Sequence, residues 1–408
     1  LDTWKKVVDE LAPKKVIWYL WGGEPFLYPD LIPLVKYIKS KDMFVAINTN
    51  GTMLEKYAEE IDASYIFVKA RAYKGNGKQR VLNMIDFYSN VQKAAKQYAK
   101  LHGKPDVILA SSVHPLTLVA GIKLAKYFGV KCICEIRDLW PESLIAYDIA
   151  KANNPAVLAL RKLEKWCYKK ADELIFTMEG AYDYIKEQHW EKDVPISKVH
   201  FINNGVDLEV FDYNKEHYTI DDEDLNNPDI FKVVYTGSIR KVNDVGKLLD
   251  AAKEIKNPKI KILIWGAGDQ LEELKQRIDN EKIENVTFKG SVKKDYIPFI
   301  VNSADLNIVH SSQSKMLFYG LSLNKMFEAL AAGNPILFDF ASKYNPAADN
   351  NACVETRDNK PQTIARNIEV ISNYEDNKIK LLSNNARKTA EEYDFKNLTD
   401  KLLSIINS

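Results

Sequence analysis

The sequence lacks any long hydrophobic run. No stretch of 18 consecutive apolar residues occurs in its 408 residues, whereas a helix that crosses a bilayer needs about 20. Charges such as Asp2, Lys5 and Glu10 interrupt the first ten residues, a pattern that differs from a secretory signal peptide. We therefore expect a cytoplasmic protein without a membrane-spanning helix.

Cysteine is scarce as well. The four cysteines, at positions 132, 134, 167 and 353, are too few for the disulfide framework of a small secreted domain. Cys132 and Cys134 stand two apart in an apolar run, so in a strand their side chains share one face. No second pair and no histidine at ligand spacing accompanies them, and we expect reduced thiols and no metal site.

Net charge is almost absent. The chain holds 57 basic and 56 acidic side chains, a net charge of +1, which argues against nucleic acid as a partner. The charge is slightly uneven, because residues 1–215 hold 31 basic and 27 acidic side chains. Such an excess would help the first half contact the inner face of a membrane, although ordinary variation along a chain explains it too and is the favoured interpretation.

What the sequence does contain is a repeated alternation of short apolar runs and helical patterns. In the first half we predict helices over 30–41, 82–101 and 116–128, where apolar residues recur at helical spacing. The predicted strands there are 16–20, 44–49, 65–69, 107–110, 131–136, 173–177 and 199–202. Strands that alternate with helices and are apolar on both faces are typical of a doubly wound parallel sheet.

An acidic, asparagine-rich stretch over 213–230 interrupts this alternation and predicts a linker. The pattern then restarts with strands at "KVVYTGSI", "IKILIWGAG", "NVTFKGSV", "LNIVH" and "PILFDF". We predict a βαβ segment over 1–64, a first Rossmann-like domain over 65–212, a second over 231–385 and a C-terminal helix over 386–408. A nucleotide-linked ligand is expected in a cleft between two such domains.

The first strand of the second domain ends in a turn suited to phosphate. Gly237 and Ser238 follow the strand, Arg240 and Lys241 add two cations, and a helix begins shortly afterwards. A glycine turn, free N–H groups at a helix start and positive charge together bind a phosphate or diphosphate. A tight turn with two solvated bases is the alternative interpretation.

Two further details belong to this region. Asn243 or Asp244 is predicted to cap the helix, because either side chain can accept from its first N–H groups. A second glycine turn, with Gly266 and Gly268, follows the next strand. It lacks the third glycine of a dinucleotide-binding loop, and such a pair of glycines also serves close packing.

A third stretch carries polar residues on one helical face. Asn324, Lys325 and Glu328 are one to four positions apart at the start of a predicted helix that Gly333 ends. A carboxylate there can hold a ribose diol, and Lys325 can meet phosphate. The alternative is an asparagine cap with a surface pair of Lys325 and Glu328, worth only about 0.2–0.5 kcal/mol.

Several motifs together resemble one family. "VVYTGSIRKVNDVGKLLDAAKEI", "NKMFEALAAGNPIL", "FINNGVDLEVF" and "CEIRDLWPESL" resemble bacterial glycosyltransferases of family 4, which have the GT-B fold of two Rossmann-like α/β domains facing a cleft. The branch that transfers N-acetylated hexosamines in polysaccharide synthesis is the most similar. The likeness covers about residues 65 to 408.

The resemblance implies roles for matched residues. The donor-binding set is Gly237, Ser238, Arg240, Lys241, Gly266, Gly268, Asn324, Lys325 and Glu328, with Glu328 on the nucleotide ribose. His114, Arg137 and Asp138 would line the first domain's side of the cleft as catalytic residues, although an isolated histidine is more often structural and charges at a strand end seek partners. Two positions depart from the family, which often has glutamate at Gly320 and lysine at Asn243.

The first 62 residues resemble a different family. "VIWYLWGGEPFLYPD" and "TNGT" are similar to a fragment of a radical S-adenosylmethionine enzyme. Such enzymes hold an iron–sulfur cluster on three closely spaced cysteines, and here no cysteine precedes Cys132. We expect residues 16–49 to serve instead as a βαβ unit that completes the first sheet, with Gly22 and Gly23 in an acceptor-side loop.

These expectations describe a glycosyltransferase without cofactor or metal. It would move a sugar, an N-acetylated hexosamine, from a UDP-sugar to a polysaccharide or lipid-linked acceptor, with retention of configuration. Two alternatives stay open: a nucleotide-sugar-binding protein without catalysis, and the remnant of a radical enzyme.

Overall fold

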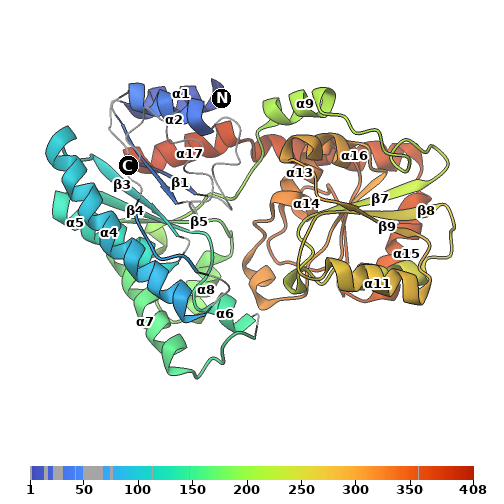
Figure 1. Cartoon of the computed structure of the whole chain (residues 1–408), viewed down its shortest axis with the longest axis horizontal. Helices are drawn as coiled ribbons and strands as arrows, with labels where there is room; N and C mark the ends of the chain where they lie inside the picture. Colours follow the sequence, from blue (N-terminus) through green and yellow to red (C-terminus); the bar gives the residue numbers. More distant parts are fainter. Residues whose placement is uncertain are drawn as a thin grey trace. The chain divides into compact units, whose positions relative to one another are not determined.

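The computed structural model describes residues 2–12, 17–21, 31–41, 43–48, 68–73, 77–112, 114–146, 148–356 and 358–408. The chain divides into two compact units. The first unit holds residues 1–177, 181–202 and 402–408, and the second holds residues 178–180 and 203–401. Labels of helices and strands follow Figure 1.

The first unit alternates strands and helices as the sequence predicts. Its elements are α1 (Asp2–Leu11), β1 (Ile17–Trp21), α2 (Leu31–Ser40), β2 (Phe44–Asn48), α4 (Lys78–His102), β3 (Val107–Ser111), α5 (Pro115–Phe128), β4 (Lys131–Ile136), α6 (Glu142–Ala146), α7 (Pro155–Lys170), β5 (Glu173–Phe176), α8 (Ala181–Glu187) and β6 (Val199–Phe201). Strands β3, β4, β5 and β6 form a parallel sheet in that order. On β4, the buried sulfur atoms of Cys132 and Cys134 lie 3.9 Å apart on one face.

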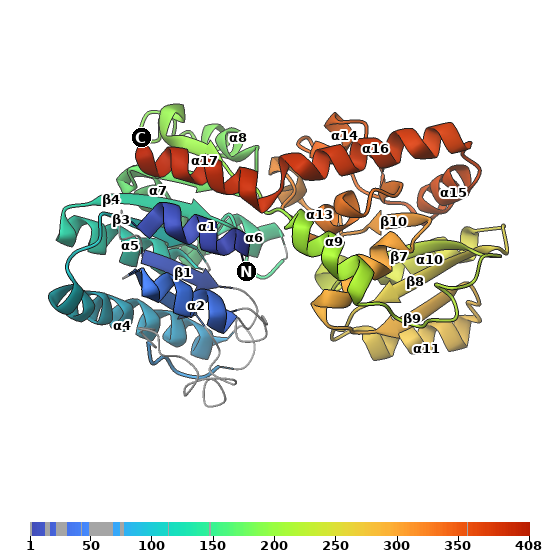
Figure 2. The ribbon, with the colours of Figure 1, turned by 90° about the horizontal axis from the view of Figure 1, so that it is seen from above.

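The predicted βαβ unit forms, and among the described residues its two strands pair only with each other. Strands β1 and β2 pair in parallel with each other, and β1 lies next to β3 without joining its ladder in the described residues. Its helices still share the core, because Val8 and Val35 pack in one cluster with Ile133 and Ile405. Figure 1 and Figure 2 show α1, α2 and the end of the C-terminal helix gathered there. The strand predicted over 65–69 lies outside the described residues except for 68 and 69, which have no regular structure.

The second unit is a six-stranded parallel sheet with helices on both faces. Its elements are α9 (Leu208–His217), β7 (Phe231–Thr236), α10 (Gly246–Glu254), β8 (Ile260–Trp265), α11 (Leu271–Glu281), β9 (Val286–Gly290), α12 (Ile297–Asn302), β10 (Leu306–Val309), α13 (Asn324–Ala332), β11 (Ile336–Phe338), α14 (Pro346–Asp349), β12 (Val354–Glu355), α15 (Pro361–Ser372), α16 (Asp376–Glu392) and α17 (Phe395–Asn407). The strand order is β12-β11-β10-β7-β8-β9. The two Rossmann-like units confirm the predicted GT-B fold class.

Successive side chains of β7 are buried on opposite faces of this sheet. Val233 and Tyr235 pack in a cluster with residues of α10 and α15, whereas Val234 packs with Ile300 of α12. This alternation is the two-residue period of a strand that helices cover on both sides. Figure 1 shows α11 and α15 along one face of the sheet and α13 and α16 along the other.

The stretch predicted as a linker is part of the second unit. Residues 208–217 form α9, and Leu225 is buried in the cluster of Val234. Asp222 accepts from Lys289 Nζ at 2.8 Å, and Asp224 pairs with Lys261 Nζ at 2.6 Å. The acidic residues therefore fasten this segment to β8 and β9 instead of leaving it in solvent.

The C-terminal helix predicted over 386–408 is the end of α16 followed by α17. The chain bends at Asp394, because Val206 N donates to Tyr393 O and Phe395 N donates to Val206 O. Asp394 starts the new helix by accepting from Lys396 N at 2.8 Å. Lys131 Nζ donates to Ile405 O at 2.9 Å, so the end of α17 belongs to the first unit. Among the described helices, none has the length and apolar character to span a bilayer.

Candidate functional site

The carboxyl ends of β7 and β10 bring together the residues that the sequence singled out in the second unit. The chain passes from β7 through β8 to β9 and then returns to β10 on the other side of β7. Open α/β sheets bind ligands at such a switch point, because neighbouring loops leave it in opposite directions. Gly237 follows β7 here, and His310 follows β10.

The loop after β7 is a fixed turn that exposes two cations. Asn243 Nδ2 donates to the Ser238 carbonyl oxygen at 2.7 Å and to its Oγ at 2.6 Å, and the Tyr235 hydroxyl donates to the same carbonyl at 3.2 Å. Arg240 and Lys241 are exposed. Within the described part of the chain neither side chain has a hydrogen bond or ion pair. Both cations are therefore available to an anionic ligand.

The predicted cap of the following helix was wrong. Helix α10 begins at Gly246 with Val245 at the cap position and no side-chain cap. The Asn243 side chain instead donates hydrogen bonds to Ser238. Asp244 has a left-handed backbone with φ 52°. Because Asn243 closes the turn, it stabilises the loop at the position where many family members have lysine.

Gly266 and Gly268 are positions of close backbone packing. A Cβ on Gly266 would lie 1.8 Å from the Gly237 oxygen, and one on Gly268 would lie 2.0 Å from the Ile239 oxygen. Backbone bonds join the two turns, with Gly237 N donating to Trp265 O at 3.0 Å and Ile239 N to Ala267 O at 2.9 Å. The second turn therefore supports the first, and direct contact of these glycines with a donor stays a prediction.

Lys325 points inward from the first turn of α13. Its Nζ donates to the His310 carbonyl oxygen, lies 3.4 Å from the Tyr235 hydroxyl and 4.6 Å from the centre of that ring. Loss of hydration lowers the pKa of Lys325 to about 8, and the charge of Asp339 opposes this shift. The alternative of a surface pair with Glu328 is not seen among the described contacts.

Glu328 lies one turn further along α13. Burial raises the pKa of Glu328 to about 7, with Lys294 opposing the shift. No side chain of the described residues bonds its carboxylate. A half-buried carboxyl group without a protein partner suits a hydroxyl-bearing ligand. Asn324, in contrast, is exposed, and its Oδ1 lies 3.3 Å from Asn204 Nδ2.

A buried pair that the sequence motifs did not indicate lies at the same sheet edge. His310 and Asp339 have no exposed surface, and His310 Nδ1 bonds Asp339 Oδ2. A signal for them exists, because each residue directly follows an apolar strand, in "LNIVH" and "PILFD". Residues in that position share the carboxyl edge of a parallel sheet.

In the first unit the structure places His114 after β3 and Arg137 and Asp138 after β4. His114 is 5% exposed and meets the Phe87 ring edge-on, and its Nδ1 has no hydrogen-bond partner among the described residues. Burial and the charge of Arg80 lower the pKa of His114 to about 4. At neutral pH it is therefore an uncharged imidazole with little affinity for a further proton.

The charge of Arg80 also acts on the pKa of Asp138. The surrounding protein withdraws water from its carboxyl group and raises its pKa, while Arg137 and Arg80 oppose the shift. The backbone of Arg137 is fixed between neighbouring loops, since its N donates to Ser112 Oγ at 3.0 Å and its O accepts from Thr177 Oγ1 at 3.3 Å. The structure thus brings the three predicted residues to one edge of the first sheet. Their catalytic role stays a prediction.

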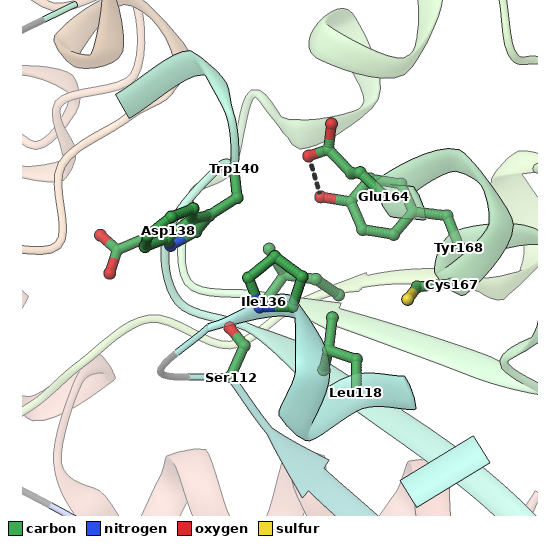
Figure 3. A pocket seen from close by; sticks show the side chains of 9 residues that line it. Ser112, Leu118, Ile136, Asp138, Trp140, Glu164, Cys167 and Tyr168 are labelled. Carbon is green, nitrogen blue, oxygen red and sulfur yellow. Dashed lines mark hydrogen bonds between the residues drawn. The ribbon is translucent and has the colours of Figure 1, made fainter. Parts of the chain in front are cut away.

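A small pocket opens beside Asp138, lined by residues that include Ser112, Trp140, Glu164 and Tyr168. Glu164 accepts from the Tyr168 hydroxyl at 2.7 Å and from the Tyr184 hydroxyl at 2.6 Å. Figure 3 shows the first of these bonds and the carboxylate of Asp138 pointing away from it. Burial raises the pKa of Glu164 to about 8, so this carboxyl group is mostly neutral at pH 7.

Two family models match consecutive parts of the chain. The model for glycosyltransferase family 4 matches residues 34–210, and the model for glycosyl transferases group 1 matches residues 219–389. The chain belongs to the family 4-like glycosyltransferases. The predicted family is therefore confirmed over both units.

Curated relatives of this glycosyltransferase are distant. A probable glycosyltransferase, WbjE, from Pseudomonas aeruginosa is 24% identical over 239 residues, which is 57% of this chain and 56% of that protein. The match thus spans about half the length of the curated relatives.

Solved structures show the same fold over most of the chain. Anabaena HepE, solved in complex with UDP, has 16% identity and a TM-score of 0.66 over 96% of this chain and 99% of that one. A Staphylococcus aureus TarM variant, solved with Fondaparinux, alpha-GlcNAc-glycerol and UDP, has 17% identity and a TM-score of 0.52 over 78% of this chain and 59% of that one.

The family match reaches into the N-terminal segment. The family 4 model begins at residue 34, inside the stretch that resembles a radical S-adenosylmethionine enzyme. Residues 34–62 therefore match a glycosyltransferase, and the comparisons give the radical-enzyme resemblance no support. Gly22 and Gly23 lie outside the described residues.

Gly320 departs from the common family pattern for a structural reason. Its φ is 127°, a region that residues with a side chain rarely adopt. A Cβ on Gly320 would also lie 3.0 Å from the backbone nitrogen of Glu179. A glutamate at this position does not fit the present backbone, so the family's second carboxylate cannot simply be added.

We expect the substitution Gly320→Glu to lower the melting temperature of the glycosyltransferase. The strained backbone alone costs of order 1–3 kcal/mol, and contact with Glu179 adds to it. Gly77→Ala is the matched control, because Gly77 has φ −85° and open space around it. A Gly320→Glu protein as stable as the wild type would contradict this account.

We expect Glu164→Gln to flatten the dependence of stability on pH. Because its pKa is raised, Glu164 keeps a proton in the folded state that it loses near pH 4.5 in the unfolded state. The free energy of unfolding of the wild type therefore falls by up to a few kcal/mol as pH rises from 4.5 towards 8. Glutamine can accept from one tyrosine hydroxyl through Oε1 and donate from Nε2 to the oxygen of the other, and it cannot ionise. Melting temperatures at pH 5, 7 and 9 test this, with the exposed Glu191→Gln as control, and parallel curves for wild type and Glu164→Gln would refute it.

Proposed function

We propose that the chain transfers a sugar from a UDP-sugar to a glycan or lipid-linked acceptor. The observation that carries this proposal is the carboxyl edge of the second sheet. There the exposed Arg240 and Lys241 follow β7, and helix α13, which comes after β10, carries the inward Lys325 and Glu328, whose carboxylate has no side-chain partner among the described residues. Three cations suit a diphosphate, and a free carboxylate suits the two hydroxyls of a ribose.

The chemistry needs these charges because the leaving group is a diphosphate. When the bond between the sugar's anomeric carbon and the phosphate oxygen breaks, negative charge grows on the diphosphate. Preorganised cations stabilise that charge more in the transition state than in the bound substrate. The acceptor hydroxyl forms the new bond to the anomeric carbon and gives its proton to a phosphate oxygen. This route proceeds with retention and requires no paired carboxylates.

An N-acetylated hexosamine is our choice of sugar. The motifs of the chain resemble the branch that transfers such sugars, and the TarM variant of the same fold was solved with UDP and alpha-GlcNAc-glycerol. His114 and Asp138, at the carboxyl edge of the first sheet, would contact the sugar or acceptor. As a neutral imidazole, His114 would act as a hydrogen-bond donor and not as a general base.

Contact with an anionic membrane is the second part of the proposal. Helix α4 carries Lys93, Lys96 and Lys100 at helical spacing on one face, and the adjacent α5 adds the exposed Lys126. Tyr127, which is 57% exposed, lies under Lys96, with the ammonium 4.3 Å from its ring centre. Basic residues beside exposed aromatic surface favour anionic lipid headgroups, where a lipid-linked acceptor would reside.

We expect the double substitution Arg240→Ala and Lys241→Ala to reduce sugar transfer about 100-fold or more, since one lost charge-stabilising group can cost about 10²–10³ in rate. Transfer from UDP-N-acetylglucosamine and UDP binding by calorimetry are measured in parallel. Lys256→Ala with Lys259→Ala is the control, because it removes the same charge from exposed residues before β8, at the opposite edge of the sheet.

The outcomes separate the competing functions. Wild-type protein that binds UDP but neither transfers nor hydrolyses the donor is the non-catalytic binding protein. Undiminished turnover in the Arg240 and Lys241 variant would remove this loop from the mechanism.

We expect Lys93→Ala, Lys96→Ala and Lys100→Ala together to weaken binding to phosphatidylglycerol vesicles about 100-fold, from roughly 1 kcal/mol for each lysine near the surface. Vesicle sedimentation at low and high salt measures this, with phosphatidylcholine vesicles and the Lys256 and Lys259 variant as controls. Equal binding of wild-type protein to both lipids, or to neither, would rule out this surface.

A further inference from the structure

A buried pair joins neighbouring strands at the carboxyl edge of the second sheet. Val309 of β10 is in register with Phe338 of β11, so the next residues, His310 and Asp339, leave the two strands side by side. Both are fully buried, and His310 Nδ1 bonds Asp339 Oδ2. The carboxylate therefore fixes the orientation of the imidazole ring.

The other ring nitrogen of His310 reaches the loop after β7. Nε2 donates to the Asp244 carbonyl oxygen at 2.8 Å, and a carbonyl only accepts, so Nε2 carries a proton. Asp244 has a left-handed backbone with φ 52°, which costs a residue with a side chain of order 1–3 kcal/mol. The bond from His310 holds the loop in that conformation immediately before α10 begins.

Two more bonds hold the same loop. Ser312, two residues after His310, donates from Oγ to the Val242 carbonyl oxygen at 2.6 Å, and Asn243 is bonded to Ser238. Arg240 and Lys241 lie between these fixed points with exposed side chains. The segment after β10 thus determines the conformation of the loop that presents the two cations.

Stability alone does not explain the pair. Replacing a buried ion pair by apolar residues of similar size is often neutral or stabilising, and the neighbours Val309 and Phe338 are buried apolar residues. Asp339 Oδ1 also lacks a hydrogen-bond partner in the described part of the chain. A pair that is costly to bury but bonds a functional loop fits a positioning role.

We propose that His310 and Asp339 are positioning residues of the nucleotide site, which hold the 240–245 loop so that Arg240 and Lys241 meet the diphosphate together. The proposal rests on the proposed function. In this role His310 does not contact the substrate, because the imidazole is fully buried and both its nitrogens are bonded.

A double-mutant cycle with UDP as the ligand tests the proposal. We expect His310→Ala to raise the Kd for UDP about tenfold, the effect of roughly one lost charge-assisted contact. Adding His310→Ala to the Arg240 and Lys241 variant should change Kd little, because no cations remain to be positioned. Such non-additivity marks residues that act through one another.

The control and the apolar replacement separate positioning from folding. Asn307→Ala removes another buried bond of β10, from Nδ2 to Val301 O at 2.9 Å, and should lower the melting temperature without changing Kd. His310→Phe with Asp339→Leu should keep the melting temperature but bind UDP about tenfold more weakly. His310→Gln retains a donor for the Asp244 carbonyl and should bind more tightly than the apolar pair; it is measured in the same cycle if His310→Ala does not fold.

The failures are distinguishable. If the Arg240 and Lys241 variant binds UDP as the wild type does, the proposed nucleotide site is wrong. If that variant binds weakly but His310→Ala binds normally, or the two effects multiply, only the positioning role is overturned. Equal affinities of the His310→Gln protein and the apolar pair would overturn it too.

Discussion

Direct backbone contact between two glycine turns is the constraint on which the second unit depends. Gly266 packs against the Gly237 oxygen and Gly268 against the Ile239 oxygen, at distances where no Cβ fits. This contact brings the ends of β7 and β8 together and determines where the loop after β7 leaves the sheet. The loop that begins at this contact carries the exposed Arg240 and Lys241.

The site is built from groups that are costly to bury, and each is compensated in its own way. His310 and Asp339 are paired with each other. Lys325 donates to a carbonyl oxygen, and burial lowers its pKa. Glu328 has no protein partner in the described structure, and its pKa is raised. Ionisable groups with shifted pKa values that share one sheet edge are characteristic of functional sites. We expect ligand hydroxyls at Glu328, the group without a protein partner among the described residues.

The buried polar groups of the first unit differ in how far their hydrogen bonds are satisfied. The Glu164 carboxyl group accepts from two tyrosine hydroxyls inside the fold, whereas one ring nitrogen of His114, at the carboxyl edge of the sheet, has no hydrogen-bond partner among the described residues. The N-terminal βαβ unit reaches this core through α1 and α2. In the part of the chain that the structure describes, apolar packing attaches this unit to the first sheet, and no ladder joins β1 to β3.

The sequence by itself determined the alternating α/β pattern, the two glycine turns and the shared face of Lys325 and Glu328, because all three are local consequences of side-chain period and backbone freedom. Only the tertiary structure decided that Asn243 closes a turn instead of capping a helix, that the acidic 213–230 stretch binds Lys261 and Lys289, and that His310 reaches Asp244. Asn243 and Ser238 are five residues apart and meet because the loop after β7 folds back on itself, whereas the other contacts join residues whose proximity depends on strand order. Strand order is set by how the whole core packs, and no local pattern contains it.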